Sequence, residues 1–186
     1  MVLFVLLILS LVAFAVVFIS VMGIYLLISS CFQKYAPPVR SSGRLKKMVL
    51  AEISQQLEKV PDGQKIVDLG SGWGTLLLPL AKKFPQHQFI GLERAFTPFH
   101  ISCIRARKIP NLQFLREDFF SYNLEQINIV LMFLIGFMMP RVTEKCLKEM
   151  SKGAKIYAVR FPLKDVEPCQ IIDLGNKMER LYIYEM

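Results

Sequence analysis

The chain has few of the side chains from which metal sites and disulfide frameworks are built. Its 186 residues include four cysteines and two histidines. Cys31, Cys103, Cys146 and Cys169 form no C-x-x-C pair, and no histidine cluster accompanies them. Zinc sites and disulfide-stabilised folds both need such spacings. We therefore expect reduced thiols and no metal site.

Charged side chains are absent from residues 2–33. About 20 consecutive apolar residues are enough to cross a bilayer core as a helix, so we expect residues 2–31 to anchor the chain in a membrane. A secretory signal peptide normally starts with positive charge, and a mitochondrial transit peptide is rich in arginine. Neither feature is present, although the stretch 28–31, Ile-Ser-Ser-Cys, leaves lipoprotein cleavage or acylation of Cys31 open.

Positive charge follows the apolar run, where five basic side chains precede the first acidic one, Glu52. They are Lys34, Arg40, Arg44, Lys46 and Lys47. The positive-inside rule then predicts a single-pass protein whose domain faces the cytoplasm, in a bacterial inner membrane or a mitochondrial inner membrane. Nucleic-acid binding is the rival explanation of the net charge of +8. No basic stripe interleaved with aromatic residues and no recognition motif supports it, so we expect no nucleic-acid partner.

The rest of the chain alternates β-rich runs with amphipathic segments. Ser41 or Ser42 can cap a helix that continues to about Leu57, after the break at Pro37-Pro38. Further helices are expected at 73–83, 97–108 and 142–150, and strands at 65–69, 88–92, 112–115, 127–133, 154–160, 170–173 and 180–184. Pro79 is expected to bend the 73–83 helix. We expect an anchor at 1–33, a linker and first helix at 34–63, and a binding domain at 64–186.

A glycine-rich turn follows the first predicted strand. Asp68 ends the apolar run, and Gly70, Ser71, Gly72 and Gly74 make a Gly-x-Gly-x-Gly pattern. Such an order of strand, glycine turn and helix builds a nucleotide site at the carboxyl edge of an α/β sheet. A threonine, at position 75, stands where a dinucleotide site has its third glycine. This departure argues against NAD.

The run from Ile66 to Thr75 resembles motif I of the class I methyltransferases, which use S-adenosylmethionine. The resemblance implies a Rossmann-like α/β fold with a mostly parallel seven-stranded sheet and one antiparallel strand. It implies that Asp68 contacts the methionine end of the cofactor and that Asp118 accepts from the adenine amino group, with Phe119 beside the base. Glu93, about twenty residues past the turn, is placed to accept from the ribose hydroxyls.

The acceptor site is expected after the fourth strand, where residues 133–140 are apolar and lack the Asn-Pro-Pro-Tyr or Asp-Pro-Pro-Tyr motif of DNA-base and glutamine methylation. Asn128 stands where many relatives have an acid. Together with the N-terminal span and Arg160-Phe161-Pro162, this loop resembles the small membrane-anchored protein-lysine methyltransferases, whose mitochondrial members modify the adenine nucleotide carrier and the ATP synthase c-subunit.

Three functions remain open from the sequence. The first is a membrane-anchored methyltransferase that acts on a lysine of a membrane protein, with no catalytic residue assigned. The second is methylation of a lipid headgroup or a lipophilic small molecule at the bilayer surface. The third is a membrane-tethered binding module without catalysis.

Overall fold

The computed structural model describes residues 2–32, 43–175 and 179–186, and the chain divides into two units, residues 1–39 and 40–186. The expected linker at Pro37-Pro38 and the expected helix cap at Ser41 or Ser42 lie outside the described residues. Each unit is described by itself.

The first unit is described as one helix, α1 (Val2–Phe32). Its segment Leu6–Tyr25 has a mean hydropathy of 2.8, and by length and composition it is able to cross a membrane. The hydroxyls of Ser10 and Ser20 donate to the carbonyls of Leu7 and Val16, at 2.8 Å each. Such bonds satisfy the polar atoms within the helix, which an apolar surrounding requires.

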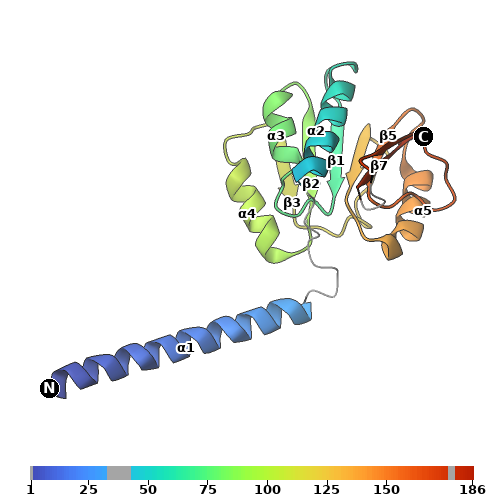
Figure 1. The fold of residues 1–186 in the computed structure, drawn as a ribbon. Coiled ribbons are helices and arrows are strands. Elements are labelled where there is room, and N and C mark those ends of the chain that lie inside the picture. The colour runs from blue at the N-terminus through green and yellow to red at the C-terminus, as the bar shows by residue number, and fades with distance from the viewer. Residues whose placement is uncertain (1, 33–42, 176–178) are drawn as a thin grey trace. The chain divides into compact units, whose positions relative to one another are not determined.

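The second unit is built on a seven-stranded sheet with the order β3-β2-β1-β4-β5-β7-β6 (Figure 1). The strands β1 to β5 run parallel, and β7 is antiparallel to both of its neighbours. The sheet therefore has the mostly parallel layout with one antiparallel strand that the sequence predicts.

Short loops connect the strands to the helices. The strands are β1 (Lys65–Leu69), β2 (Gln88–Leu92), β3 (Leu112–Leu115), β4 (Ile129–Met132), β5 (Lys155–Val159), β6 (Gln170–Asp173) and β7 (Arg180–Glu185). The helices are α2 (Gly43–Leu57), α3 (Leu77–Lys83), α4 (Phe96–Ala106) and α5 (Met139–Glu149), with a 3-10 turn η1 (Gly136–Met138).

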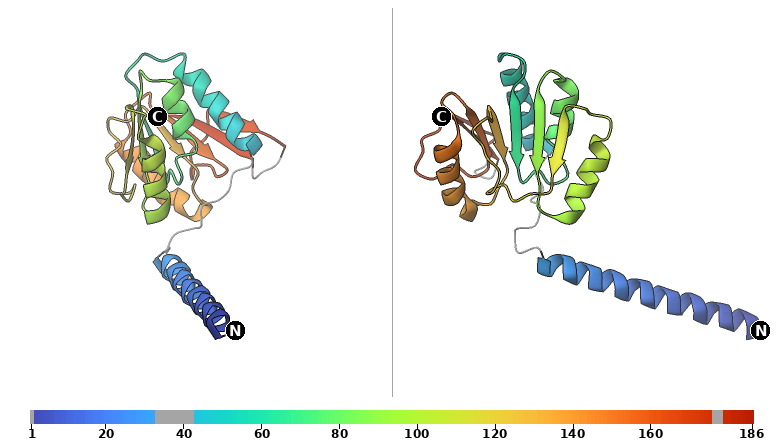
Figure 2. Two further views of the ribbon diagram at one scale, coloured as in Figure 1. Left: turned by 90° about the vertical axis from the view of Figure 1, so that its left-hand side faces the viewer. Right: turned by 180° about the vertical axis from the view of Figure 1, so that it is seen from behind.

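Two hydrophobic clusters hold the helices to the sheet, because alternate residues of each strand face opposite sides. The helices α2, α3 and α4 cover one face of the sheet and α5 covers the other (Figure 2). Ile66 of β1 belongs to the cluster under α2, α3 and α4, whereas Val67 and Leu69 belong to the cluster under α5. The side chain of Asp68 therefore points to the same face of the sheet as that of Ile66, and it is buried.

The helix expected at 73–83 begins later, at Leu77. Gly74 has a φ of +70°, which the right-handed helix does not allow. Pro79 consequently lies in the first turn of α3, where most backbone N–H groups have no intrahelical acceptor. A helix that begins at Leu77 therefore gives Pro79 no intrahelical hydrogen bond to remove.

We predict that Gly91→Ala lowers the free energy of unfolding by about 1–3 kcal/mol, the usual range for overpacking a core. A Cβ at this position of β2 would lie 2.3 Å from Cδ1 of Phe114 and 2.8 Å from Oγ of Ser71. Thermal or chemical denaturation measures the change. Gly43→Ala is the control, because a Cβ there meets nothing within 4 Å. Equal stability of the two variants would contradict the packing described.

Candidate active site

The loop between β1 and α3 turns sharply at three glycines. Gly70, Gly72 and Gly74 have φ values of +76°, +53° and +70°. These angles lie in the left-handed region, which residues with a Cβ rarely adopt. The loop thereby leaves the carboxyl end of β1 and reaches α3 within seven residues, 70–76.

The ring of Phe114, on β3, fixes this path. A Cβ added to Gly74 would lie 2.5 Å from Cζ of the ring, and one added to Gly91 would lie 2.3 Å from Cδ1. Two glycines from different elements therefore make room for one aromatic side chain. Gly72 differs, because an added Cβ would meet nothing within 4 Å. The loop therefore has free space for a ligand beside Gly72.

The amides of the loop are already engaged within the protein. Gly70 and Ser71 both donate to the carbonyl oxygen of Leu92 at 2.9 Å, and Gly72 donates to Oε2 of Glu93 at 2.8 Å. A dinucleotide site instead offers such amides to a pyrophosphate. Here a carboxylate takes the place that a phosphate would need, so the loop favours a cationic ligand over an anionic one.

Asp68 is a buried acid at this edge of the sheet, with 3% of its surface exposed. Burial, and secondarily the charge of Glu93, raises the pKa of its carboxyl group from 3.8 to about 7. An acid placed in this way favours a ligand that brings a positive charge or N–H donors.

These residues fit S-adenosylmethionine, which carries a sulfonium and an ammonium charge. Asp68 is the last but one residue of β1 and Glu93 directly follows the neighbouring strand β2, so they supply two carboxylates beside the loop. Glu93 also accepts from the amide of Ala95 at 2.7 Å, so its orientation is fixed from both sides. Oγ of Ser71 is buried and has no hydrogen-bond partner among the described residues.

Asp118 and Phe119 lie in the turn after β3. Oδ1 of Asp118 accepts from the amide of Phe120 at 3.0 Å, and Oδ2 lies 3.6 Å from Nη1 of Arg94. The rings of Phe119 and Phe120 are 4.5 Å apart between centroids. Asp118 thus orders its own turn, and its expected bond to adenine stays a prediction.

The apolar loop after β4 approaches the segment that follows β5. A Cβ added to Gly136 would lie 3.2 Å from the ring of Phe161, and the guanidinium of Arg160 lies 5.1 Å from the ring centroid of Phe133. Phe137 is 73% exposed. The loop is held by aromatic contacts and presents one large apolar side chain to its surroundings.

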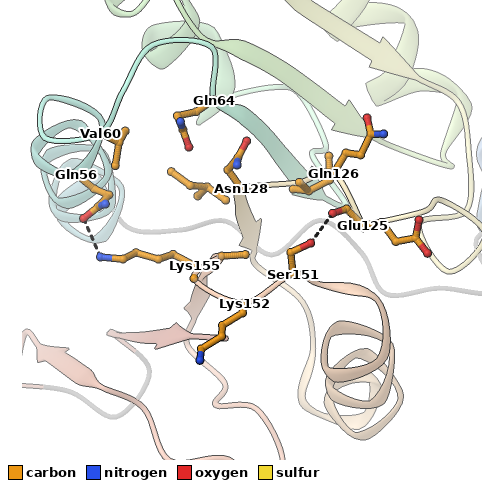
Figure 3. A pocket seen from close by; sticks show the side chains of 13 residues that line it. Gln56, Val60, Gln64, Glu125, Gln126, Asn128, Ser151, Lys152 and Lys155 are labelled. Atoms are coloured by element: carbon orange, nitrogen blue, oxygen red, sulfur yellow. Dashed lines mark hydrogen bonds between the residues drawn. The ribbon is translucent and has the colours of Figure 1, made fainter.

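A polar pocket of about 220 Å³ lies at the other edge of the sheet, at the amino ends of β1, β4 and β5 (Figure 3). Lys155 donates to Gln56 across it at 3.1 Å. Asn128, which stands where many relatives have an acid, lines this pocket and accepts from the amide of Lys65. None of the expected cofactor residues lines it, so it is separate from the candidate active site.

The structure brings most of the expected residues to one edge. Asp68 lies at the carboxyl end of β1, and the glycine loop, Glu93 and the Asp118-Phe119 turn follow the carboxyl ends of β1, β2 and β3. The sequence reasoning missed Phe114 and Gly91, whose close contact shapes the loop. A glycine inside an otherwise apolar strand was the available signal, because it often marks a close approach.

Comparisons with known proteins agree with this geometry. A family model described as the ANTKMT methyltransferase domain matches residues 68–170, more than half of the chain. A protein-lysine N-methyltransferase of Saccharolobus islandicus is 22% identical over 134 residues, which cover 69% of this chain and 83% of that protein. A carboxy-S-adenosyl-L-methionine synthase of Nautilia profundicola is 32% identical over 96 residues, or 50% of this chain and 41% of that protein.

The fold has solved counterparts. An RNA methyltransferase from Salinibacter ruber in complex with S-adenosyl-L-homocysteine aligns with a TM-score of 0.69 at 16% identity, covering 79% of this chain and 93% of that one. At that identity the likeness shows the shared fold. The match to the family model establishes the family and the class of activity. The chain belongs to the ANTKMT methyltransferase domain family and is an S-adenosylmethionine-dependent methyltransferase.

Proposed function

We propose that this methyltransferase is a membrane-anchored protein-lysine N-methyltransferase that acts on a membrane protein. The observation that carries the proposal is the loop 133–140, which has no ionisable side chain and lies at the cofactor edge. The S. islandicus relative, named as a protein-lysine N-methyltransferase, supports it. The apolar helix α1 supports an acceptor at or in a membrane.

Methyl transfer to lysine needs a neutral amine, aligned with the sulfonium methyl that the cofactor supplies. An apolar surrounding disfavours the ammonium form and lowers the pKa of a lysine. The loop 133–140 offers such a surrounding and holds no group able to act as a base. The proton would then leave to water before the amine enters, and the protein contributes positioning and dehydration.

For the cofactor we propose the residues that the sequence singled out. Asp68 would pair with the ammonium group of the methionine end, and Glu93 would accept from the ribose hydroxyls with its remaining lone pairs. Gly70, Ser71, Gly72 and Gly74 would form the wall beside the methionine and ribose. Asp118 and Phe119 would contact the adenine.

For the anchor we propose a single pass through residues 2–31, with the domain on the cytoplasmic side. The five cations between Lys34 and Lys47 support this orientation. A bacterial inner membrane or a mitochondrial inner membrane would satisfy the proposal.

Methylation of a lipid headgroup or lipophilic small molecule is the alternative. The exposed ring of Phe137 favours it, because an aromatic side chain at the mouth of a site suits an amphiphilic acceptor at an interface. The two functions differ in where the methyl group is found after the reaction.

Asp68→Asn is predicted to stabilise the cofactor-free domain and to weaken cofactor binding. Because folding raises the carboxyl pKa from 3.8 to about 7, the native protein loses stability as the pH rises through this interval. Removing the charge raises the free energy of unfolding by at most about 4 kcal/mol above pH 7, and by nearly nothing below pH 4. Thermal denaturation across this range tests the gain.

The same variant loses a charge-assisted contact, so S-adenosylmethionine binding should weaken roughly 10–100-fold. In the wild-type protein the affinity should rise with pH through about 7, as Asp68 ionises. Calorimetric titration at several pH values measures both. A variant that binds as tightly as wild type, with the same pH profile, contradicts the role of Asp68.

Gly72→Arg is predicted to abolish cofactor binding while leaving the fold intact. The side chain would project into the open space beside the loop, and the backbone penalty at a φ of +53° is about 1–2 kcal/mol. Gly153→Arg is the matched control, because Gly153 also has a positive φ, +84°, and open space around its Cβ direction. Similar melting temperatures with binding lost only in the first variant are expected. Retained binding would place the cofactor elsewhere.

The acceptor is identified by incubating the full chain in membranes with methyl-labelled S-adenosylmethionine. Label in a protein band that releases methyl-lysine on acid hydrolysis is the expected result. Gly72→Arg is the background control. Label confined to the lipid extract would replace the lysine proposal by the alternative.

A further inference from the structure

Arginine and phenylalanine side chains pair around the cofactor edge of the sheet. The guanidinium carbons of Arg116, Arg141 and Arg160 lie 5.2, 3.9 and 5.1 Å from the ring centroids of Phe96, Phe120 and Phe133. Distances of this size are those of cation–π contacts. The six side chains come from segments after β2, β3, β4 and β5, so the sheet topology brings them to one edge.

Two large apolar side chains stand out beside these pairs. Phe96 is 57% exposed at the start of α4, and Phe137 is 73% exposed in η1. We call the group of Arg116, Arg141, Arg160, Phe96 and Phe137 the Arg–Phe rim. These side chains lie at the same edge of the sheet as the candidate active site.

Three of the acids at this edge, Asp68, Glu93 and Asp118, are buried or bonded within the protein. Glu93 accepts from the amides of Gly72 and Ala95, and Asp68 is buried. Asp118 accepts from the amide of Phe120 and lies beside Arg94, and Glu117 is half-buried. The Arg–Phe rim itself carries three positive charges, and Glu117 and Asp118 follow Arg116 directly in the sequence.

The helix α2 precedes the sheet in the sequence and connects it to the apolar helix α1. The end of α2 lies at the opposite edge, where Gln56 contacts Lys155, and the helix runs back from there toward its start at Gly43 (Figure 1). Only residues 33–42 separate α2 from α1 in the sequence. The anchor is therefore joined in the sequence to the domain through the start of α2.

We infer that the Arg–Phe rim is a contact surface for an anionic phospholipid bilayer. Arginine binds phosphate oxygens through two parallel hydrogen bonds, and aromatic side chains are favoured at the depth of the headgroups. Basic residues near a membrane are attracted by its anionic lipids. Such contact would place the mouth of the active site on the membrane and bring it to an acceptor at that surface. The inference rests on the proposed membrane anchoring.

The test places one tryptophan in the rim of the full chain. Trp73, the single native tryptophan, is replaced by phenylalanine. Phe137→Trp then reports on the rim, and Leu147→Trp is the matched control, because Leu147 is also exposed, at 57%, but lies toward the far end of α5. Both chains are reconstituted in vesicles of phosphatidylcholine and phosphatidylglycerol whose acyl chains carry bromine, which quenches tryptophan at short range. Melting curves establish that both variants fold.

We expect bromine to quench the Phe137→Trp chain several-fold more than the Leu147→Trp chain. This difference should shrink in phosphatidylcholine alone, and in the anionic vesicles when Arg116→Gln and Arg141→Gln are added. Equal quenching of the two chains in anionic vesicles overturns the inference. Flotation of the wild-type chain with the vesicles reports anchoring separately, so a failure of the rim is distinguished from a failure of the anchor.

A nucleic acid is the other polymer that binds arginine next to aromatic rings. Polyuridylate is therefore added to the Phe137→Trp chain in detergent. A fluorescence change with this RNA, without bromine quenching in vesicles, would assign the rim to nucleic acid and overturn the membrane inference. Absence of both responses overturns it as well.

Discussion

The packing of Phe114 against two glycines is the constraint on which the site depends. Its ring occupies the space that side chains at Gly74 and Gly91 would fill, and so joins β3, β2 and the loop after β1. With the ring in place, the loop amides turn inward to Leu92 and Glu93. The site is thus defined by an apolar contact, and its hydrogen bonds follow from the path that this contact imposes.

Much of the fold could be predicted from the sequence, because buried parallel strands are short apolar runs between turn residues. The bounds of β1, β2 and β3 agree with the expected ranges to the residue. The start of α3 could not be read in this way, since the conformation of Gly74 depends on Phe114, forty residues further along. Sequence periodicity carries no information on such distant contacts.

The candidate site was predictable in part. Asp68, Glu93 and the glycines lie at or just after the carboxyl ends of strands, where the topology alone places them together. The partners of Asp118 were not predictable, because Arg94 comes from the turn after another strand. The Arg–Phe contacts could not be predicted from the sequence for the same reason, because each arginine is separated from its phenylalanine by at least twenty residues. The order of the strands thus places both kinds of charge at the cofactor edge. Asp68 and Glu93 lie beside the glycine loop, and the arginines of the Arg–Phe rim lie in the segments that follow β3, β4 and β5.

The buried carboxylate of Asp68 has a consequence for the protein in a cell. A group that is costly to bury without its ligand makes the fold depend on that ligand, since binding to the native state alone adds stability by mass action. Differences of one or two kcal/mol change the steady-state abundance of a protein several-fold through proteolysis of its unfolded form. A copy of this protein without its cofactor would therefore be more exposed to proteolysis than a copy that holds it.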